Sequence, residues 1–526
     1  MKRIIGYIIG GVALTLASAA PVRAAENPTF GGTINYLVEA EPPTLVTIAH
    51  TAGASTRISP KITEGLLTYD LDFKPVPVLA TSWDVSPDGL RYTFRLREGV
   101  KWHDGRDFSA ADVAYSLKLL RENHPRGRGT FANVTEIQTP DANTVVLLLG
   151  KPAPYLLAAL DASESPIVPK HLYEGVDVLT NRNASAPIGT GPFRFKEWVK
   201  GSHVVVERNP DYWDGKKPYL DRIVFRFIPD TAARAAAFEA KELDIGGGPP
   251  VARSDIARLL KLPHLAGETR GYDYNGAFTQ LFFNFDNPIL RDRRVRLAIA
   301  HAIDLDLLLQ AVWFGYGQIA TTAISPNLKA FHDPSIARYG FNVGKANQLL
   351  DEAGYPRKSD GKRFTLRVFN NPYFGKGSAD FLRQALTKIG VGVDLQIFDF
   401  TTYISRTYTN RDFDLTVEAL ANTFDPTLGV QRIYWSKNFK IGLPFSNASR
   451  YANPAVDTLL EAAAIEPDTE ARARIWKDLQ KVLHDDVAAV NLIVPQGVTI
   501  YNKRVKNHTT TIVGVNASFA DVYIGD

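Results

Sequence analysis

The amino-acid sequence predicts an α/β protein of more than one domain, in which strands alternate with helices that cover them. Alternating apolar and polar residues predict strands over 143–149, 204–207, 222–228 and 364–369. Apolar residues at helical spacing predict helices over 232–243, 293–303, 345–353 and 379–389. Gly354 and Gly390 follow the last two helices as C-terminal stops. The chain has 526 residues, too many for one ordinary core, and we expect two or three domains.

The first residues predict a secretory signal peptide over 1–24. Lys2 and Arg3 precede an apolar run, and small residues then lead to a cleavage site after Ala24 or Ala25. No later apolar run approaches the roughly 20 residues of a membrane-spanning helix, so we expect a soluble mature protein. Cysteine is absent, which leaves no acylated cysteine as a lipid anchor. We therefore expect the mature protein in the periplasm.

Charge and residue types exclude several function classes. Without the three basic residues of the leader, the formal net charge falls from +4 to +1, which gives no sign of a nucleic-acid surface. The ten histidines lack the spacing of a zinc site, so we expect neither a metal nor another cofactor. The pair His103-Asp104 lies in a glycine turn and is interpreted as a surface turn. The sequence has no P-loop, so energy for transport would come from a partner.

Residues 65–118 combine several local structural signals. Ser86-Pro87-Asp88-Gly89 predicts a turn, because proline sets φ and glycine accepts a positive φ. The alternation over 91–97 predicts a strand. Ser109 and Asp112 have the spacing of a capping box, which predicts a helix that begins after Ser109. The buried stripe of this helix would be Val113, Leu117 and Leu120.

Four blocks of residues, spread over nearly the whole chain, carry a family resemblance. The blocks are Glu64-Gly65-Leu66-Leu67-Thr68-Tyr69-Asp70 with the segment just described, Gly189-Thr190-Gly191-Pro192-Phe193 with Asn209-Pro210-Asp211-Tyr212-Trp213, Arg294-Val295-Arg296-Leu297-Ala298-Ile299-Ala300 with Ala302-Ile303-Asp304, and Tyr451-Ala452-Asn453-Pro454. In this order they resemble family 5 of the extracytoplasmic solute-binding proteins, the peptide, opine and nickel family of ABC importers.

The resemblance implies an α/β fold of the two-lobe periplasmic binding protein type (class II, cluster C), with an extra subdomain inserted in lobe I. Lobe I would comprise 25–60, 187–284 and 498–526, the inserted subdomain 61–186, and lobe II 285–497. The chain would cross between the lobes near 283–288 and 493–497, where extended apolar residues are combined with proline.

The chain departs from its peptide-binding relatives within 413–426. There the resemblance implies a tryptophan and, a few residues later, an aspartate that pairs with the free amine of a peptide. Depending on how the segment is aligned, the aspartate position holds Asn422 or Thr423 and the tryptophan position holds Ala419 or Leu420. A buried ammonium without a carboxylate partner is costly, so binding through a free amine is disfavoured.

The candidate substrate-binding residues are Asn422, Thr423, Trp435, Asn447 and Thr51. The first two follow from the family pattern, the next two lie in the same strand-end region, and the last lies in a loop of small residues. Asparagine and threonine suit a neutral polar group. Alternatively, Asp425 or Glu418 would replace the missing carboxylate.

These features predict a binding protein rather than an enzyme. It would capture a small peptide-like or otherwise amide-rich solute by closing its lobes, and deliver that solute to the permease subunits of an ABC importer. We expect a monomer. An oligosaccharide or opine-like ligand and a chemosensory role remain as alternatives. An exported hydrolase is disfavoured, because the S-x-x-K pattern at Ser359 lies in a predicted loop and not at a helix start.

Overall fold

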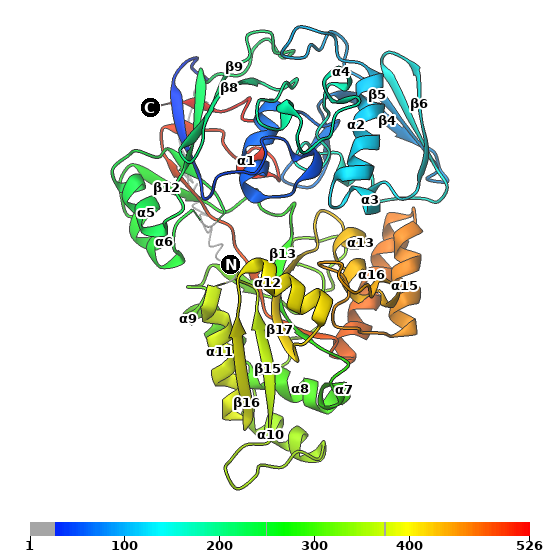
Figure 1. Cartoon of the computed structure of the whole chain (residues 1–526), viewed down its shortest axis with the longest axis vertical. Coiled ribbons are helices and arrows are strands. Elements are labelled where there is room, and N and C mark those ends of the chain that lie inside the picture. The colour runs from blue at the N-terminus through cyan, green and yellow to red at the C-terminus, as the bar shows by residue number, and fades with distance from the viewer. Residues whose placement is uncertain (1–26, 249, 373–374, 526) are drawn as a thin grey trace, which may run out of the picture.

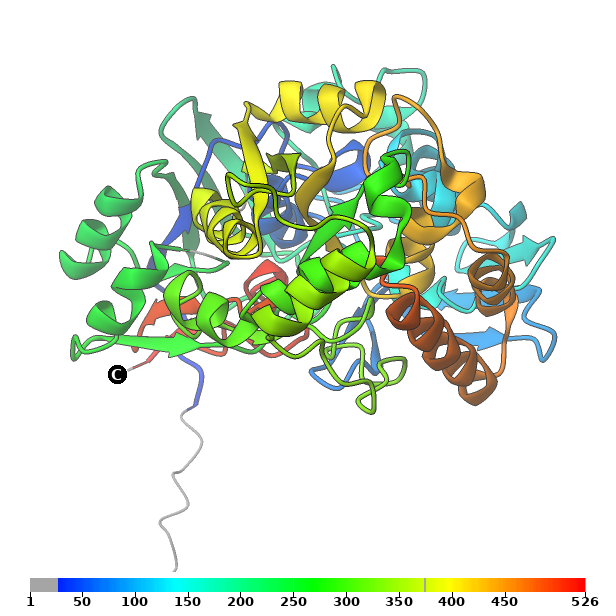
Figure 2. The same ribbon diagram turned by 90° about the horizontal axis from the view of Figure 1, so that it is seen from below.

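The computed structural model of the chain describes residues 27–248, 250–372 and 375–525. The signal peptide and its cleavage site lie outside these residues. Figure 1 shows two bodies, and the upper one contains both the earliest and the latest described segments. Figure 2 shows the same arrangement from below, with the helices of the lower body toward the viewer. Among the described residues, no helix combines the length and the apolar character needed to cross a bilayer.

The upper body contains a seven-stranded sheet, which we call lobe I together with the helices packed on it. The strands in order are β12 (Leu265–Glu268), β20 (Thr499–Asn502), β11 (Ile245–Gly246), β1 (Thr33–Val38), β10 (Arg222–Phe227), β9 (His203–Arg208) and β8 (Phe193–Val199). The helices of lobe I are α1 (Gly53–Ile62), α5 (Thr231–Glu239) and α6 (Arg253–Leu259). Because β1 pairs in parallel with β10, and β20 runs antiparallel to β11 and β12, distant parts of the chain share one sheet.

A second sheet in the upper body forms the inserted subdomain. Its antiparallel strands are β4 (Ala80–Val85), β5 (Arg91–Leu96), β7 (Thr144–Leu149) and β6 (Val134–Asp141), with the hairpin of β2 (Leu67–Tyr69) and β3 (Pro75–Pro77) and the helices α2 (Ala110–Asn123), α3 (Gly127–Thr130) and α4 (Lys170–Tyr173). The local predictions are confirmed here: Gly89 has φ +68°, and Ser109 and Asp112 form a capping box. The predicted stripe of α2 is buried.

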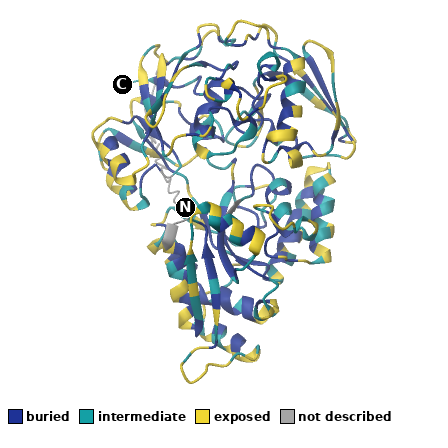
Figure 3. Ribbon diagram, in the orientation of Figure 1, coloured by how far each residue is buried: buried dark blue, intermediate teal, exposed yellow. Residues whose placement is uncertain are grey.

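The lower body, lobe II, contains a five-stranded sheet. Its strands in order are β16 (Val391–Ile397), β15 (Phe364–Asn370), β17 (Leu415–Ala421), β13 (Ala277–Phe283) and β18 (Ala489–Asn491), and β14 (Gly317–Ile319) pairs separately with β19 (Ile493–Pro495). Its helices are α7 (Pro288–Arg291), α8 (Arg293–Ala302), α9 (Leu305–Ala311), α10 (Val343–Glu352), α11 (Gly375–Lys388), α12 (Phe400–Ile404), α13 (Pro426–Gly429), α14 (Gln431–Tyr434), α15 (Pro454–Ile465) and α16 (Thr469–Asp485). Figure 3 shows dark, buried strands inside a shell of helices with exposed outer faces.

The first passage between the lobes lies earlier in the chain than the sequence predicts. Strand β13 pairs with β17 along its whole length, so residues 277–283 belong to the sheet of lobe II and not to lobe I. The passage therefore falls between β12 and β13, over 269–276. The sequence signal at 283–288 marks instead the bend between β13 and α7. The second passage, over 496–498, joins β19 of lobe II to β20 of lobe I.

The two passages contact each other. A side chain at Gly497 would collide with the ring of Tyr272, since its Cβ would lie 2.4 Å from that ring. The Tyr272 hydroxyl lies 2.6 Å from the Thr499 hydroxyl and accepts a hydrogen bond from the Gly248 amide. The absence of a side chain at Gly497 thus allows the two crossing segments to pack face to face.

Candidate functional site

The inserted subdomain and lobe II touch at α3 and α13, which Figure 1 shows on facing edges of the two bodies. A Cβ at Gly129 of α3 would lie 3.9 Å from Leu428 Cδ2 of α13. Beside this contact, Tyr274 from the first passage lies 6.1 Å from the ring of Phe73 in the inserted subdomain and 5.0 Å from the ring of Phe424 in lobe II. The insert of lobe I and lobe II thus meet here, and we take this interface as the candidate ligand site.

Asn422 and Thr423 lie at the end of β17, but their side chains are used inside lobe II. The Asn422 amide oxygen accepts a hydrogen bond from the Ser325 amide (2.6 Å), and its amide nitrogen donates to the Ala323 carbonyl (3.1 Å). Thr423 has φ +56°, and its hydroxyl donates to the Asn422 carbonyl (2.6 Å). Both side chains are buried. Their contacts stabilise the turn after β17 and hold the Asn422 amide inside lobe II.

The two alternative carboxylates are also engaged. Asp425 forms a bidentate ion pair with Arg472, at 2.8 and 2.6 Å, and accepts a hydrogen bond from the Thr427 amide. Glu418 accepts hydrogen bonds from Tyr403 (2.6 Å), Tyr408 (3.2 Å) and Asn371. Because the pair is buried and the other carboxylate is surrounded by donors, neither group is placed to receive the ammonium of a peptide.

The remaining predicted site residues differ in position. Asn447 is buried, and its amide group bonds the main chain of Tyr451 in both directions. The indole nitrogen of Trp435 donates to Glu461 on α15 (2.9 Å), so this ring is held within lobe II. Thr51 is half-buried in lobe I, in the loop before α1. The structure therefore brings Asn447 and Trp435 together, since the Asn447 amide donates to the Trp435 carbonyl (3.3 Å), but it does not gather all five predicted residues into one cluster.

Two side chains at the interface have buried donors without a partner. The Nε of Arg432, on α14, and the Nε2 of His124, at the C-terminal end of α2, make no hydrogen bond within the described part of the chain. Burial, and secondarily the charge of Arg126, lowers the pKa of Arg432 to about 10. Sequence reasoning missed both residues. The sequence did contain one sign of an unpaired arginine. No acidic residue lies three or four positions from Arg432, the spacing at which two side chains of one helix can form an ion pair.

Hydrogen bonds of Glu64 and His103 connect the inserted subdomain to lobe I. Glu64 is 2% exposed and accepts hydrogen bonds from Tyr212 (2.7 Å), Thr190 (2.8 Å) and the indole of Trp213 (3.0 Å). Burial raises the pKa of Glu64 to about 7, against the lowering effect of these donors. His103 also ties the parts together, because its ring bonds the main chain of 189–191. The predicted turn is present, with Asp104 and Gly105 exposed, but the ring of His103 is used in the link to lobe I.

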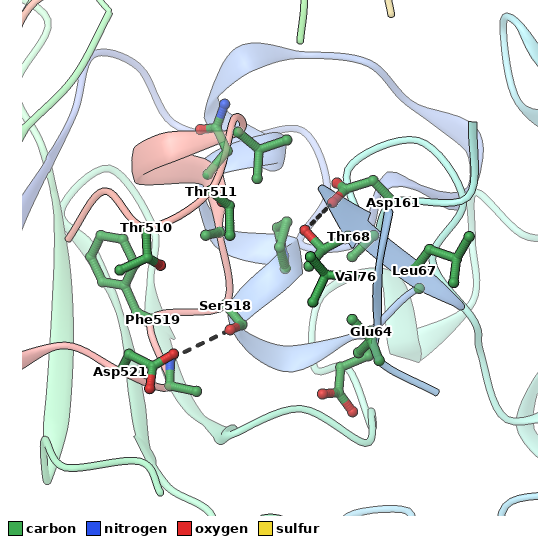
Figure 4. A pocket seen from close by; sticks show the side chains of 18 of the residues that line it. Glu64, Leu67, Thr68, Val76, Asp161, Thr510, Thr511, Ser518, Phe519 and Asp521 are labelled. Carbon is green, nitrogen blue, oxygen red and sulfur yellow. Dashed lines mark hydrogen bonds between the residues drawn. The ribbon is translucent and has the colours of Figure 1, made fainter. Parts of the chain in front are cut away.

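A cavity of about 330 Å³ lies beside Glu64, between the start of the inserted subdomain and the C-terminal segment of the chain. Figure 4 shows Thr68 bonded to Asp161 on one side of it, and Thr510, Thr511 and Ser518 on another. All these walls belong to lobe I and its insert, so closure of the lobes is not needed to form the cavity. Within the described residues, no cluster of three or more histidine or acidic side chains could hold a metal ion.

Comparison with known proteins identifies the family. Residues 74–440 match the family described as "Bacterial extracellular solute-binding proteins, family 5 Middle". A putative ABC transporter peptide-binding protein of Brucella ovis is 29% identical over 460 residues, which cover 85% of this chain and 84% of that protein.

Two solved structures are similar over almost the whole chain. The periplasmic binding protein DppA of Helicobacter pylori, in complex with the peptide STSA, is 28% identical with a TM-score of 0.80, over 95% of this chain and 99% of that one. The binding protein AgaA of A. tumefaciens R10, in complex with agropinic acid, is 27% identical with a TM-score of 0.77, over 94% and 99%. The predicted two-lobe α/β fold is confirmed, and the chain belongs to family 5 of the bacterial extracellular solute-binding proteins.

Proposed function

We propose that this protein is the periplasmic binding component of an ABC importer, and that it holds a small peptide-like or otherwise amide-rich solute between its two lobes. The observation that carries the proposal is the interface of α3 with α13, where unpartnered polar groups from both lobes lie close to the contact. A ligand placed there touches both lobes only when they are shut, so its binding favours the closed state.

The named relatives support a solute of this class. The protein of Brucella ovis is described as peptide-binding, and DppA of Helicobacter pylori holds a tetrapeptide. AgaA holds agropinic acid on the same fold, so the fold alone does not select the solute. The selection must come from residues of this chain. We propose no catalytic role, since the family is one of solute-binding proteins.

Small-angle scattering and calorimetry on the mature protein test the proposal. A saturating ligand, identified by mass spectrometry of material released from gently purified protein, is expected to reduce the radius of gyration and to raise the melting temperature. An unchanged radius at saturation would contradict lobe closure. The mature chain is expected to begin at Ala25 or Glu26 and to carry no lipid, which the intact mass of the periplasmic form would show.

Uptake measurements separate transport from chemosensing. A strain that lacks the gene is expected to lose import of the released ligand, with uptake restored by the gene in trans. Normal import combined with lost chemotaxis would favour the chemosensory alternative instead.

A further inference from the structure

Arg432 is a half-buried cation that makes no ion pair with the described residues. It makes no ion pair, and its Nε has no hydrogen-bond partner. The ring of Phe445 lies 5.6 Å from the guanidinium carbon and covers one side of it. Burying a donor such as this Nε without a hydrogen bond is costly, so the group calls for a partner.

The helical run that carries Arg432 points this side chain toward the inserted subdomain. α13 and α14 follow each other without a break in helical backbone, because Val430 bonds Pro426 and Tyr434 bonds Val430. Leu428 and Arg432 are four residues apart and therefore share one face of this run. Since Leu428 contacts α3, Arg432 lies one turn further along the same interface. Its electrostatic coupling to Arg126, the residue that precedes α3, agrees with this position.

On the facing side of the interface, His124 offers a neutral donor, and the charge of Arg126 is already balanced. Arg126 is neutralised by a bidentate pair with Glu164, whose Oε2 lies 2.8 Å from the Arg126 Nε. The Arg126 amide donates to His124 Nδ1 (3.3 Å), which places the proton of the neutral ring on Nε2. His124 is 5% exposed, and its Nε2 has no partner. Burial lowers the pKa of this histidine to about 4, which keeps the ring neutral at physiological pH.

The nearby carboxylates of lobe II are not ion-paired with Arg432. Glu418 attracts the guanidinium, but it forms no ion pair with it and accepts hydrogen bonds from two tyrosines and an asparagine. Asp425 is paired with Arg472. The positive charge of Arg432 thus remains unbalanced at the surface where a ligand would touch both lobes.

We propose that Arg432 receives an anionic group of the ligand, a carboxylate, and that His124 Nε2 donates to the same group when the lobes are shut. A guanidinium matches a carboxylate in geometry, and the fork forms two parallel hydrogen bonds. This inference rests on the proposed function and specifies its substrate class: amide-rich solutes with a free acid end, recognised without a charged partner for an amine.

Matched peptide mixtures test the inference on the mature protein. One mixture contains N-acetylated tripeptides with free C-terminal carboxylates, and the other contains the same peptides as C-terminal amides. We expect the acids to raise the melting temperature of the unaltered protein, and the amides to bind at least tenfold more weakly in calorimetry. Arg432→Gln is expected to reduce affinity for the acids roughly ten- to hundredfold and to abolish the preference.

Two controls keep the experiment decisive. Arg450→Gln removes an exposed arginine of the same lobe, paired with Asp286, and should leave both affinities unchanged. Arg432→Gln itself should have an unchanged or higher melting temperature without ligand, because the Arg432 side chain makes no hydrogen bond or ion pair with described residues. Equal binding of acids and amides, or a preference that survives in Arg432→Gln, would overturn the inference while the proposed function stands. No response to either mixture would overturn the peptide-like assignment as well.

Discussion

Two polar regions of lobe II, separated by only a few residues along the chain, differ in how far their hydrogen bonds are satisfied. In the turn after β17, residues 422–427, the side chains of Asn422, Thr423 and Asp425 all bond other groups of the lobe. Among the residues that the structure describes, the Arg432 side chain forms no ion pair, and the Nε2 of the facing His124 donates to no acceptor. Buried polar groups are normally satisfied, so a satisfied network indicates structure and an unsatisfied one indicates a missing partner.

The family pattern points to the turn at 422–427 as the ligand site, whereas the unsatisfied groups of the structure point to Arg432 and His124. Asn422 and Thr423, which the family pattern predicted for the ligand site, serve here to fix a turn. The unsatisfied donor of Arg432 lies on the next helical run, and that of His124 lies across the interface at the end of α2.

The largest effect is expected from breaking the pair of Asp425 and Arg472. Both side chains are about 5% exposed or less, and the guanidinium also bonds Thr427 and the Ala463 carbonyl. Arg472→Gln would leave a buried carboxylate unpaired, which is expected to lower the free energy of unfolding by roughly 3–5 kcal/mol in urea denaturation.

The exposed Arg474, two residues away, provides the control, because surface pairs such as its long contact with Glu470 contribute little. Adding Asp425→Asn to Arg472→Gln should recover part of the loss, since asparagine can still cap α13. A loss below about 1 kcal/mol in the single variant would show that this network is not structural.

Glu64 differs from Asp425, because its buried carboxyl accepts hydrogen bonds from the neutral side chains of Thr190, Tyr212 and Trp213 and not from a cation. Its pKa in the folded protein is raised to about 7, above the ordinary value of 4.5. The folded state therefore holds the proton more tightly, so the stabilisation is complete below about pH 4.5 and is lost as pH rises through 7. In the unaltered protein this amounts to roughly 3 kcal/mol between the two limits.

Glu64→Gln should remove this pH dependence, because the amide does not titrate. The measurement is the difference in unfolding free energy between variant and unaltered protein from pH 4.5 to pH 8, in which the contributions of the buried histidines cancel. Parallel stability curves for the two proteins would contradict the raised pKa.

Asn422→Asp tests whether the family's amine site can be restored. The new carboxylate would replace an amide that donates to the Ala323 carbonyl, so two acceptors would face each other in a buried place. We expect a loss of roughly 1–3 kcal/mol in unfolding free energy. Asn410→Asp, at an exposed position, is the matched control.

Peptides with free amino ends should bind weakly to both the unaltered protein and Asn422→Asp, as measured by calorimetry. Submicromolar binding of ordinary dipeptides or tripeptides by the unaltered protein would refute this expectation. Loss of that binding in Asp425→Asn or Glu418→Gln would then identify a substitute carboxylate.

The sequence correctly predicted those features of the fold that depend on residues close together in the chain. The turn before β5 and the capped start of α2 depend on residues within a few positions of each other, and both were correct. The lobe of β13 was wrong, because its partner β17 lies more than a hundred residues away. The role of Asn422 was hidden for the same reason, since its partners Ala323 and Ser325 are almost as distant. For Arg432, the only sign in the sequence was the lack of an acidic residue three or four positions away.

Trp435 is expected to give the smallest effect, although the sequence placed it in the site. Its ring packs partly buried in lobe II, and its indole nitrogen bonds Glu461, which also pairs with Lys437. Trp435→Phe keeps an aromatic ring and removes one hydrogen bond to an exposed acid, so we expect a loss of about 1 kcal/mol or less and an unchanged affinity for the acid peptides. Arg432→Gln, three residues earlier, is the paired measurement, because it should leave stability intact and lose binding. A tenfold loss of affinity in Trp435→Phe would place this ring in the ligand wall and remove the distinction between the two positions.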